Sequence, residues 1–138
     1  MKKIFPLLVI FFFTLISCNP DDDFKNPEKQ IKGTWILKQV VQQKNNATVV
    51  LDRSNTEFNF DGATVSIKKD TPLHDLGNYN YSLLLENYFN QDLQEPKGKV
   101  LTIDGIRYMF EITATGNNIN LTNFSDGRIF YYLERKTN

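Results

Sequence analysis

The sequence has few of the side chains that enzymes most often use for chemistry. It contains one cysteine, Cys18, and one histidine, His74. One cysteine cannot form a disulfide within the chain, and one histidine excludes a metal site built from several histidines. No glycine-rich phosphate loop follows any expected strand, because the glycines are spread one to a turn. The composition therefore excludes a disulfide scaffold and several common kinds of active site.

The remaining candidates for catalysis are weak. His74 lies beside Asp75 in an expected loop with no nucleophile nearby in the sequence, so we expect it to be an exposed loop residue. Glu57, Glu86 and Glu111 fall on strand edges or polar faces, where solvated acids are expected rather than a catalytic pair. The sequence predicts no catalytic residue, no metal site and no cofactor.

The chain also lacks an excess of positive or negative charge. The chain has 16 basic and 16 acidic residues. Removal of residues 1–17 takes away Lys2 and Lys3 and leaves 14 basic residues against 16 acidic ones. A nucleic-acid partner would require a basic face, so none is expected.

The only long hydrophobic run is Ile4–Ile16, which spans 13 residues. It is too short to cross a bilayer, which takes about 20 residues, but it fits the apolar core of a signal peptide that starts with Lys2 and Lys3. The segment Leu15-Ile16-Ser17-Cys18 resembles the bacterial lipobox, in which a small residue precedes the cysteine that is lipidated. The sequence therefore predicts a signal peptide over residues 1–17 and a lipid on Cys18 that anchors the chain to a membrane.

Residues 18–30 are expected to form a flexible acidic tether. This stretch is rich in proline and charge and has little to bury. Asp21–Asp23 lack the turn glycine and distal glutamate of a calcium loop, so they are interpreted as a solvated linker. The run also resembles the acidic stretch after the lipidated cysteine of Bacteroidetes surface lipoproteins. This resemblance implies the outer membrane and favours surface display; the periplasmic face of a membrane stays open.

Residues 31–138 are expected to form one all-β domain. They are rich in aromatic residues and threonine and poor in alanine, which favours strands. Period-two patterns separated by tight turns predict about eight strands in an antiparallel up-and-down meander, closed as a small barrel, with an open β-sandwich as the alternative.

Particular residues fix the expected turns and faces of this meander. Asp61-Gly62 and Asp104-Gly105 each predict a two-residue type I′ hairpin turn, which would place Phe60 opposite Ala63. In the first strand, Val41 is expected on the same face as Trp35.

The segment Gly33-Thr34-Trp35 carries a family resemblance. A Gly-x-Trp motif opens the first strand of lipocalins, and with the hairpins that follow, the domain looks like the small lipocalin-like domains of Bacteroidetes lipoproteins. The resemblance implies an eight-stranded barrel in which Trp35 closes one end. It also implies that an arginine near the last strand, Arg135 in this chain, stacks on that tryptophan through a cation–π contact.

An excess of aromatic residues leaves two functions open. Inward-facing side chains could line a cavity for a small hydrophobic or amphiphilic ligand, and the candidates for this lining are Tyr79, Tyr81, Leu83, Tyr108 and Phe110. Alternatively, these side chains fill the barrel. The chain would then be an interaction module that docks on another envelope protein or a host molecule through residues 70–78 and the irregular segment 86–98.

Overall fold

A computed structural model describes residues 27–89 and 97–137. The predicted signal peptide, Cys18 and Asp21–Asp23 lie outside the described residues. Within these residues, one short helix precedes nine strands, and their bounds are α2 Pro27–Ile31, β1 Gly33–Lys44, β2 Ala47–Asp52, β3 Glu57–Phe60, β4 Thr64–Ile67, β5 Gly77–Glu86, β6 Gly98–Ile103, β7 Ile106–Ile112, β8 Asn118–Asn123 and β9 Arg128–Arg135. Among the described residues, no helix has the length and apolar character needed to cross a bilayer.

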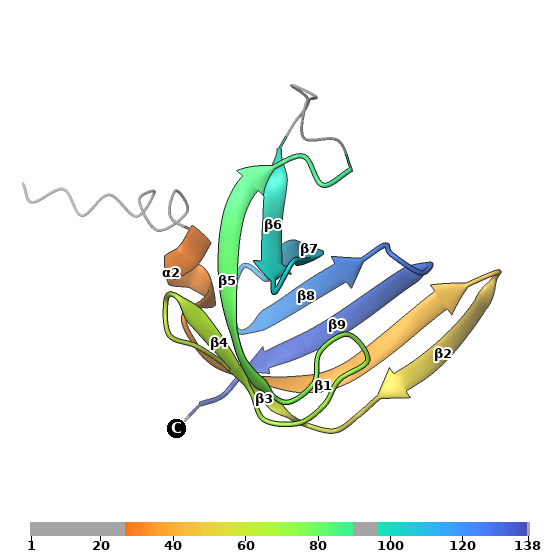
Figure 1. Ribbon diagram of the computed structural model, residues 1–138, viewed down its shortest axis with the longest axis horizontal. Coiled ribbons are helices and arrows are strands. Elements are labelled where there is room, and N and C mark those ends of the chain that lie inside the picture. Colours follow the sequence, from red (N-terminus) through yellow and green to blue (C-terminus); the bar gives the residue numbers. More distant parts are fainter. Residues whose placement is uncertain (1–26, 90–96, 138) are drawn as a thin grey trace, which may run out of the picture.

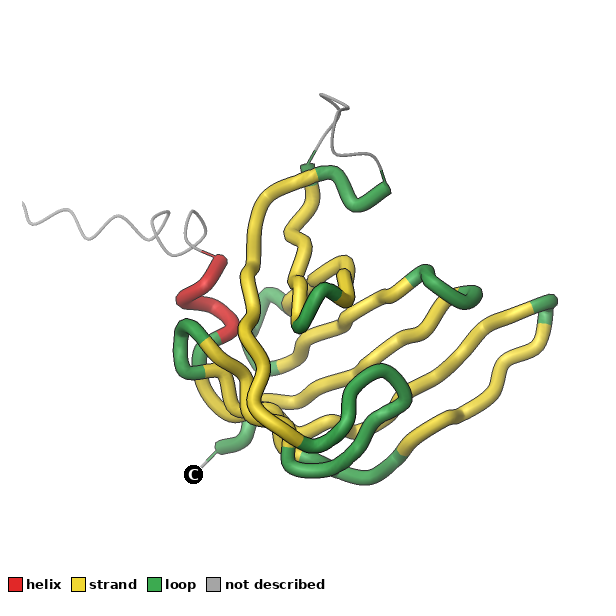
Figure 2. Tube along the Cα trace, viewed as in Figure 1, coloured by secondary structure: helices red, strands yellow, loops and turns green. Residues whose placement is uncertain are grey.

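The strands form one antiparallel sheet that closes into a barrel. Their order is β2-β1-β3-β4-β5-β6-β7-β8-β9, and β1 also pairs with β9 (Figures 1 and 2). This additional pairing joins the first strand to the last one through eight residue pairs, from Trp35 with Arg135 to Gln43 with Arg128. The predicted all-β meander and its closure into an eight-stranded barrel are confirmed, and the open sandwich is excluded.

The ninth strand, β2, is an addition to the barrel. The first part of β1 pairs with β3, whereas Val40–Lys44 pair with β2. Because β9 occupies the other edge of β1, β2 and β3 share one edge and use different stretches of it. Within the described part of the chain, β2 has no second neighbour, and it lies at the outer edge of the sheet (Figure 1).

The two Asp-Gly turns differ. Asp104 and Gly105 both have positive φ angles, 47° and 79°, and Ile103 pairs with Ile106, as a type I′ turn requires. The prediction is wrong at Asp61-Gly62, where only the glycine has a positive φ and Phe60 pairs with Val65 instead of Ala63. The Asp61 carboxylate accepts hydrogen bonds from the backbone amides of Ala63 and Thr64, which stabilises a longer turn.

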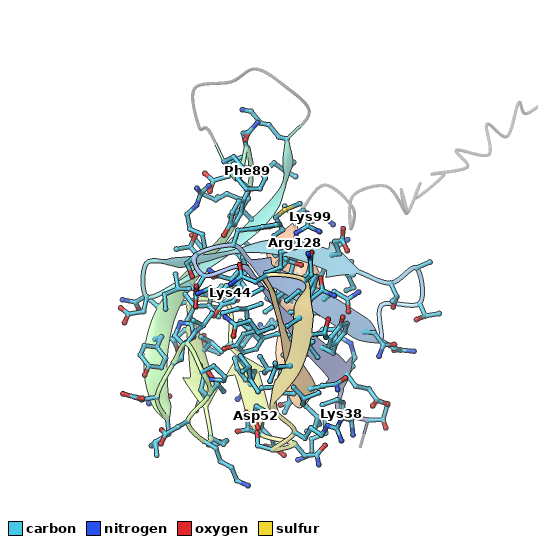
Figure 3. All side chains as sticks on the ribbon, turned by 90° about the vertical axis from the view of Figure 1, so that its right-hand side faces the viewer. Lys38, Lys44, Asp52, Phe89, Lys99 and Arg128 are labelled. Atoms are coloured by element: carbon cyan, nitrogen blue, oxygen red, sulfur yellow. The ribbon has the colours of Figure 1, made fainter. Side chains whose placement is uncertain are left out.

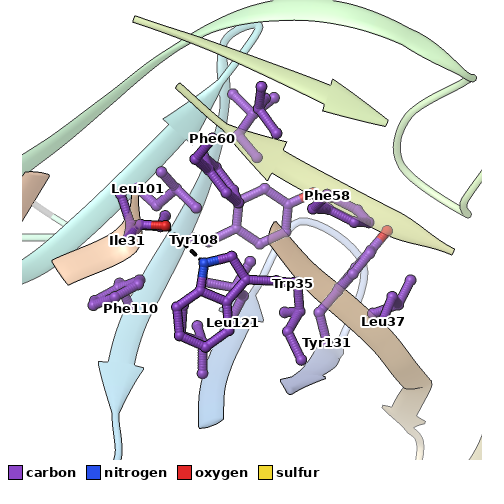
Figure 4. Close-up of a cluster of buried hydrophobic side chains, with 14 of the residues drawn as sticks. Ile31, Trp35, Leu37, Phe58, Phe60, Leu101, Tyr108, Phe110, Leu121 and Tyr131 are labelled. Carbon is purple, nitrogen blue, oxygen red and sulfur yellow. Dashed lines mark hydrogen bonds between the residues drawn. The ribbon is translucent and has the colours of Figure 1, made fainter. Parts of the chain in front are cut away.

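Bulky apolar side chains fill the inside of the barrel. Trp35, Tyr108, Tyr131, Phe58 and Phe60 are the largest of the side chains that are fully buried (Figure 4). Among the described residues, the whole buried cluster lies between Ile31 and Leu133. A chain that starts at residue 18 therefore contains all of this core, and we expect it to fold on its own.

A bulge in β1 changes which valine faces this core. The pairing with β9 shifts between Leu37 and Gln39, so Lys38 is an extra residue on its strand. After the bulge Val40 joins the core cluster, whereas Val41, which is also buried, pairs with Phe130 and does not belong to that cluster. The predicted inward orientation of Val41 is therefore wrong.

Candidate functional site

The predicted residues of the barrel end meet at one point. The guanidinium carbon of Arg135 lies 4.1 Å from the ring centroid of Trp35, so the expected cation–π contact is present. Gly33 has a φ of 120°, and a Cβ there would lie 3.2 Å from Nη1 of Arg135, so a glycine suits both the backbone and the close approach. The indole Nε1 of Trp35 donates a 2.7 Å hydrogen bond to the carbonyl of Ile31 in α2 (Figure 4).

The five predicted ligand-lining residues belong to the packed interior or its margin. Leu83, Tyr108 and Phe110 are at most 4% exposed and belong to the core cluster. Tyr79 and Tyr81 are partly buried and pack against this cluster; the Tyr81 ring lies edge-on to Phe60 at 5.0 Å. None of the five lines either of the two surface openings described below. A ligand inside the barrel would have to displace side chains of the core.

His74 is buried, contrary to the expected exposed position in a loop. It is only 6% exposed, because the loop between β4 and β5 folds back onto the barrel interior. The Nε2–H of His74 donates to the carbonyl of Ile103 at 3.1 Å, and the hydroxyl of Tyr108 donates to Nδ1 at 3.2 Å. Both contacts suit a neutral imidazole, and burial lowers the pKa of His74.

The same loop is held by a second interior tyrosine. The hydroxyl of Tyr131 accepts a hydrogen bond from the backbone amide of Leu73 at 3.2 Å and donates to Oγ1 of Thr71 at 3.4 Å. Burial raises the pKa of both Tyr108 and Tyr131, so both hydroxyls stay protonated. The polar side chains in the barrel therefore hold the loop in place and present no reactive group.

A groove lined largely by apolar residues lies on the outside of the barrel. Three aromatic side chains, Tyr88, Phe89 and Phe124, contact one another with ring centroids 5.0–5.2 Å apart. Together with Leu73 and Ile106 they line an open space of about 490 Å³, which we call the rim groove. Phe89 is 73% exposed, more than any other large apolar side chain in the described residues.

Arg107 fixes the aromatic wall of the rim groove. Its guanidinium lies 5.2 Å from the ring centroid of Tyr88, donates to the carbonyl of Tyr88 at 2.6 Å and forms a 2.7 Å ion pair with Glu86. The hydroxyl of Tyr88 donates to the carbonyl of Arg107 and accepts from the backbone amide of Phe124. Residues far apart in the sequence are thereby joined in one rigid wall.

A polar pocket lies next to this wall. It has a volume of about 510 Å³, and its lining includes Lys44, Asn45, Asn46 and Arg128. The guanidinium carbon of Arg128 is 5.8 Å from the ring centroid of Phe124, so an apolar opening and a polar one meet at this pair. In Figure 3, Phe89, Arg128 and Lys44 follow one another down the same side of the molecule.

No family model, curated protein or solved structure matches this chain. Its function must therefore be argued from the geometry of the chain alone. Within residues 27–89 and 97–137, no group of three or more His, Cys, Asp or Glu side chains could hold a metal ion. The rim groove is the surface feature that best fits a binding site.

Sequence reasoning found only part of this groove. Tyr88 and Phe89 lie in the irregular segment 86–98 that was expected to contact a partner. Phe124 was not predicted, although an aromatic residue in the turn before Ser125-Asp126-Gly127 has no place in a strand pattern. Its contact with Tyr88 depends on the three-dimensional pairing of β7 with β8 and could not be read from the sequence.

Proposed function

We propose that this chain is a lipid-anchored, non-enzymatic binding protein of the bacterial envelope, and that it holds a small apolar or amphiphilic ligand in the rim groove. One observation carries the proposal: side chains fill the barrel, while Tyr88, Phe89 and Phe124 form an apolar wall at the surface. Ligand sites are typically concave, largely apolar and about 300–1,000 Å³ in volume, and the groove, at about 490 Å³, is in this range.

The absence of reactive groups at this surface supports a role in binding. The imidazole of His74 is buried and hydrogen-bonded on both nitrogens, so it has no free nitrogen for proton transfer. Arg107 and Glu86 are engaged with each other and stabilise the wall. The groove therefore offers contact area and shape, and no pair of acid and base.

The proposed cellular location of the protein depends on residues 1–23. Lys2 and Lys3, the apolar run and Cys18 support a lipid anchor, and Asp21–Asp23 support export to the outer face of the outer membrane. Replacing the three aspartates by alanine should reduce the cleavage of the protein by protease added to intact cells. Unchanged cleavage would mean that the acids are only a linker, and protection of the unmodified protein would place it on the periplasmic face.

The binding proposal can be tested with a fluorescent apolar probe, N-phenyl-1-naphthylamine, which brightens when it leaves water. Phe89→Ser and Phe124→Ser should each weaken probe binding, because each removes part of the wall. Leu76→Ser is the matched control, since Leu76 is 64% exposed and does not line the groove. Equal binding by all four proteins would refute the proposal.

The alternative is a protein partner that docks on the same surface. Exposed apolar residues next to residues 86–89, such as Leu84 and Leu85 at 51% and 52% exposure, favour this second function. If the probe does not bind, but Phe89→Ser prevents co-purification of a partner from the native envelope while Leu76→Ser does not, the docking function is preferred.

A further inference from the structure

The rim groove and the polar pocket together define a class of ligand. We propose that the site binds a single-chain amphiphile with an anionic head, whose apolar chain lies against Phe89 and Phe124 and whose head is bound by Arg128. This inference rests on the proposed function, and it specifies the charge of the ligand and the residue that recognises that charge.

The apolar part of the site suits a narrow chain. Leu73 and Ile106 line the rim groove together with the aromatic wall, so a ligand there meets carbon from several segments of the chain. The side-chain amide of Asn123 is already used, since Nδ2 donates to the carbonyl of Arg107 and Oδ1 accepts from Ser125. The groove itself therefore offers few free hydrogen-bonding groups, which favours an alkyl chain over a sugar.

Two of the three cations that line the rim groove or the polar pocket already have acidic partners. Arg107 is paired with Glu86 at 2.7 Å, and Lys44 is paired with Asp126. Asp126 also accepts a hydrogen bond from Nε2 of Gln42, and these contacts lower its pKa, so it stays ionised and neutralises Lys44. Arg128 is different: among the described residues, no carboxylate forms an ion pair with it.

Arg128 also lies between the rim groove and the polar pocket. Its guanidinium stacks 5.8 Å from the centroid of Phe124, which lines the rim groove, while Arg128 itself lines the polar pocket. Asn45 and Asn46 line the same pocket, and their backbones have φ angles of 50° and 61° in the tight turn between β1 and β2. A carboxylate or phosphate group that follows an alkyl chain would leave the apolar wall beside the guanidinium of Arg128, which contacts Phe124.

Charge balance excludes the two other kinds of head. A cationic head would meet the guanidinium of Arg128 without a free carboxylate nearby, because Asp126 and Glu86 are both paired. A neutral head would form no ion pair with that guanidinium, so Arg128 would not add to its affinity. Only an anionic head uses both halves of the site.

The test compares three probes that share one chain and differ in their heads: decanoate, decyl maltoside and decyltrimethylammonium, each below its critical micelle concentration. The protein is the chain from residue 18 with Cys18→Ser, which contains the whole core, and binding is measured by isothermal titration calorimetry. Decanoate should bind most tightly. Arg128→Gln should weaken decanoate about fivefold, the value of an exposed ion pair near 1 kcal/mol, and change decyl maltoside by less than about twofold.

Arg53→Gln is the matched control, because Arg53 is an exposed arginine between β2 and β3 that lines neither opening. It should leave all three affinities within about twofold of the parent protein, and raising the salt concentration should weaken only decanoate. The inference is overturned if decanoate and decyl maltoside bind equally, or if Arg53→Gln weakens decanoate as much as Arg128→Gln does.

The same experiment separates this inference from the proposed function. If the three probes bind equally and Phe89→Ser weakens all of them, the groove binds apolar chains and only the assignment of an anionic head fails. If none of the probes binds, both the inference and the proposed ligand-binding function fail.

Discussion

Replacing Arg135 by methionine should destabilise the closed end of the barrel. The Arg135 side chain donates to three carbonyls, those of Gln30 at 2.9 Å, Gly116 at 3.0 Å and Lys32 at 3.1 Å, and it stacks on Trp35. These contacts join α2 and the residue after it, the turn between β7 and β8, and β9. Methionine keeps an unbranched apolar stem of similar reach, but it removes the charge and every donor.

The expected loss follows from these contacts. A hydrogen bond from a charged donor is worth about 1.5–3 kcal/mol when no water replaces it, and a cation–π contact is worth about 0.5–2 kcal/mol. Arg135 is half-buried, so water replaces part of each bond. Taking about 0.7 kcal/mol for each of the three bonds and about 1 kcal/mol for the ring, we expect a loss of about 3 kcal/mol.

Denaturation by urea, followed through the fluorescence of Trp35, measures this loss directly, because Trp35 is the only tryptophan of the chain. Arg135→Lys should lose about 2 kcal/mol, since an ammonium group keeps the charge but cannot reach all three carbonyls. Arg53→Met, a change of the same kind at an exposed site, should stay within about 0.5 kcal/mol of the parent protein.

Two outcomes would refute this reasoning. One is a loss below about 1 kcal/mol for Arg135→Met, which is smaller than the ring contact and one bond together. The other is an interaction energy near zero between Arg135→Met and Trp35→Phe in a double-mutant cycle, followed by circular dichroism because the fluorophore is then absent.

Three further predictions concern other parts of the chain. The lowered pKa of His74 means that the unfolded state binds its proton first, so stability should fall as the pH drops below about 6.5. The urea midpoint should drop less between pH 7 and pH 5 in His74→Gln than in the parent protein. An equal drop in the two proteins would contradict the role of the buried imidazole. Gly127→Ala should cost about 3 kcal/mol or more, because its Cβ would lie 2.5 Å from the carbonyl of Gln43; Gly105→Ala, also at positive φ but with open space around it, should cost about 1 kcal/mol. Cys18→Ala should leave an uncleaved precursor that takes up no labelled palmitate in cells, and unchanged labelling would disprove lipidation.

The overall architecture could be predicted because it depends on local patterns. Alternating apolar residues and turn residues are properties of short segments, and they predicted the meander and the turn at Asp104-Gly105 correctly. Apolar residues occupy both faces of 129–133, so alternation alone does not orient β9. The structure resolves it, with Ile129, Tyr131 and Leu133 in the core and Phe130 and Tyr132 outside.

The details that failed depend on contacts between distant residues or on small irregularities. The bulge at Lys38 changes the alternation of β1 without any glycine or proline to indicate it. His74 is buried because its loop meets Ile103 and Tyr108, which lie about 30 residues further along the chain. The wall of the rim groove likewise joins Tyr88 to Phe124 across 36 residues. The alternation of apolar residues and the residue types of the turns carry no information on contacts between such distant residues.

The pairing of β1 with β9 has a consequence for how the protein is made. Trp35 and Arg135 are paired across 100 residues, so the seam of the barrel cannot close before β9 has been synthesised. Contacts of such long sequence separation make folding slow. A nascent chain that lacks β9 leaves the edges of β1 and β8 unpaired and has no cation for Trp35, and we expect it to stay unfolded while it emerges. If the chain is exported, as its N-terminal sequence predicts, this delay would keep the polypeptide unfolded until translocation across the membrane is nearly complete.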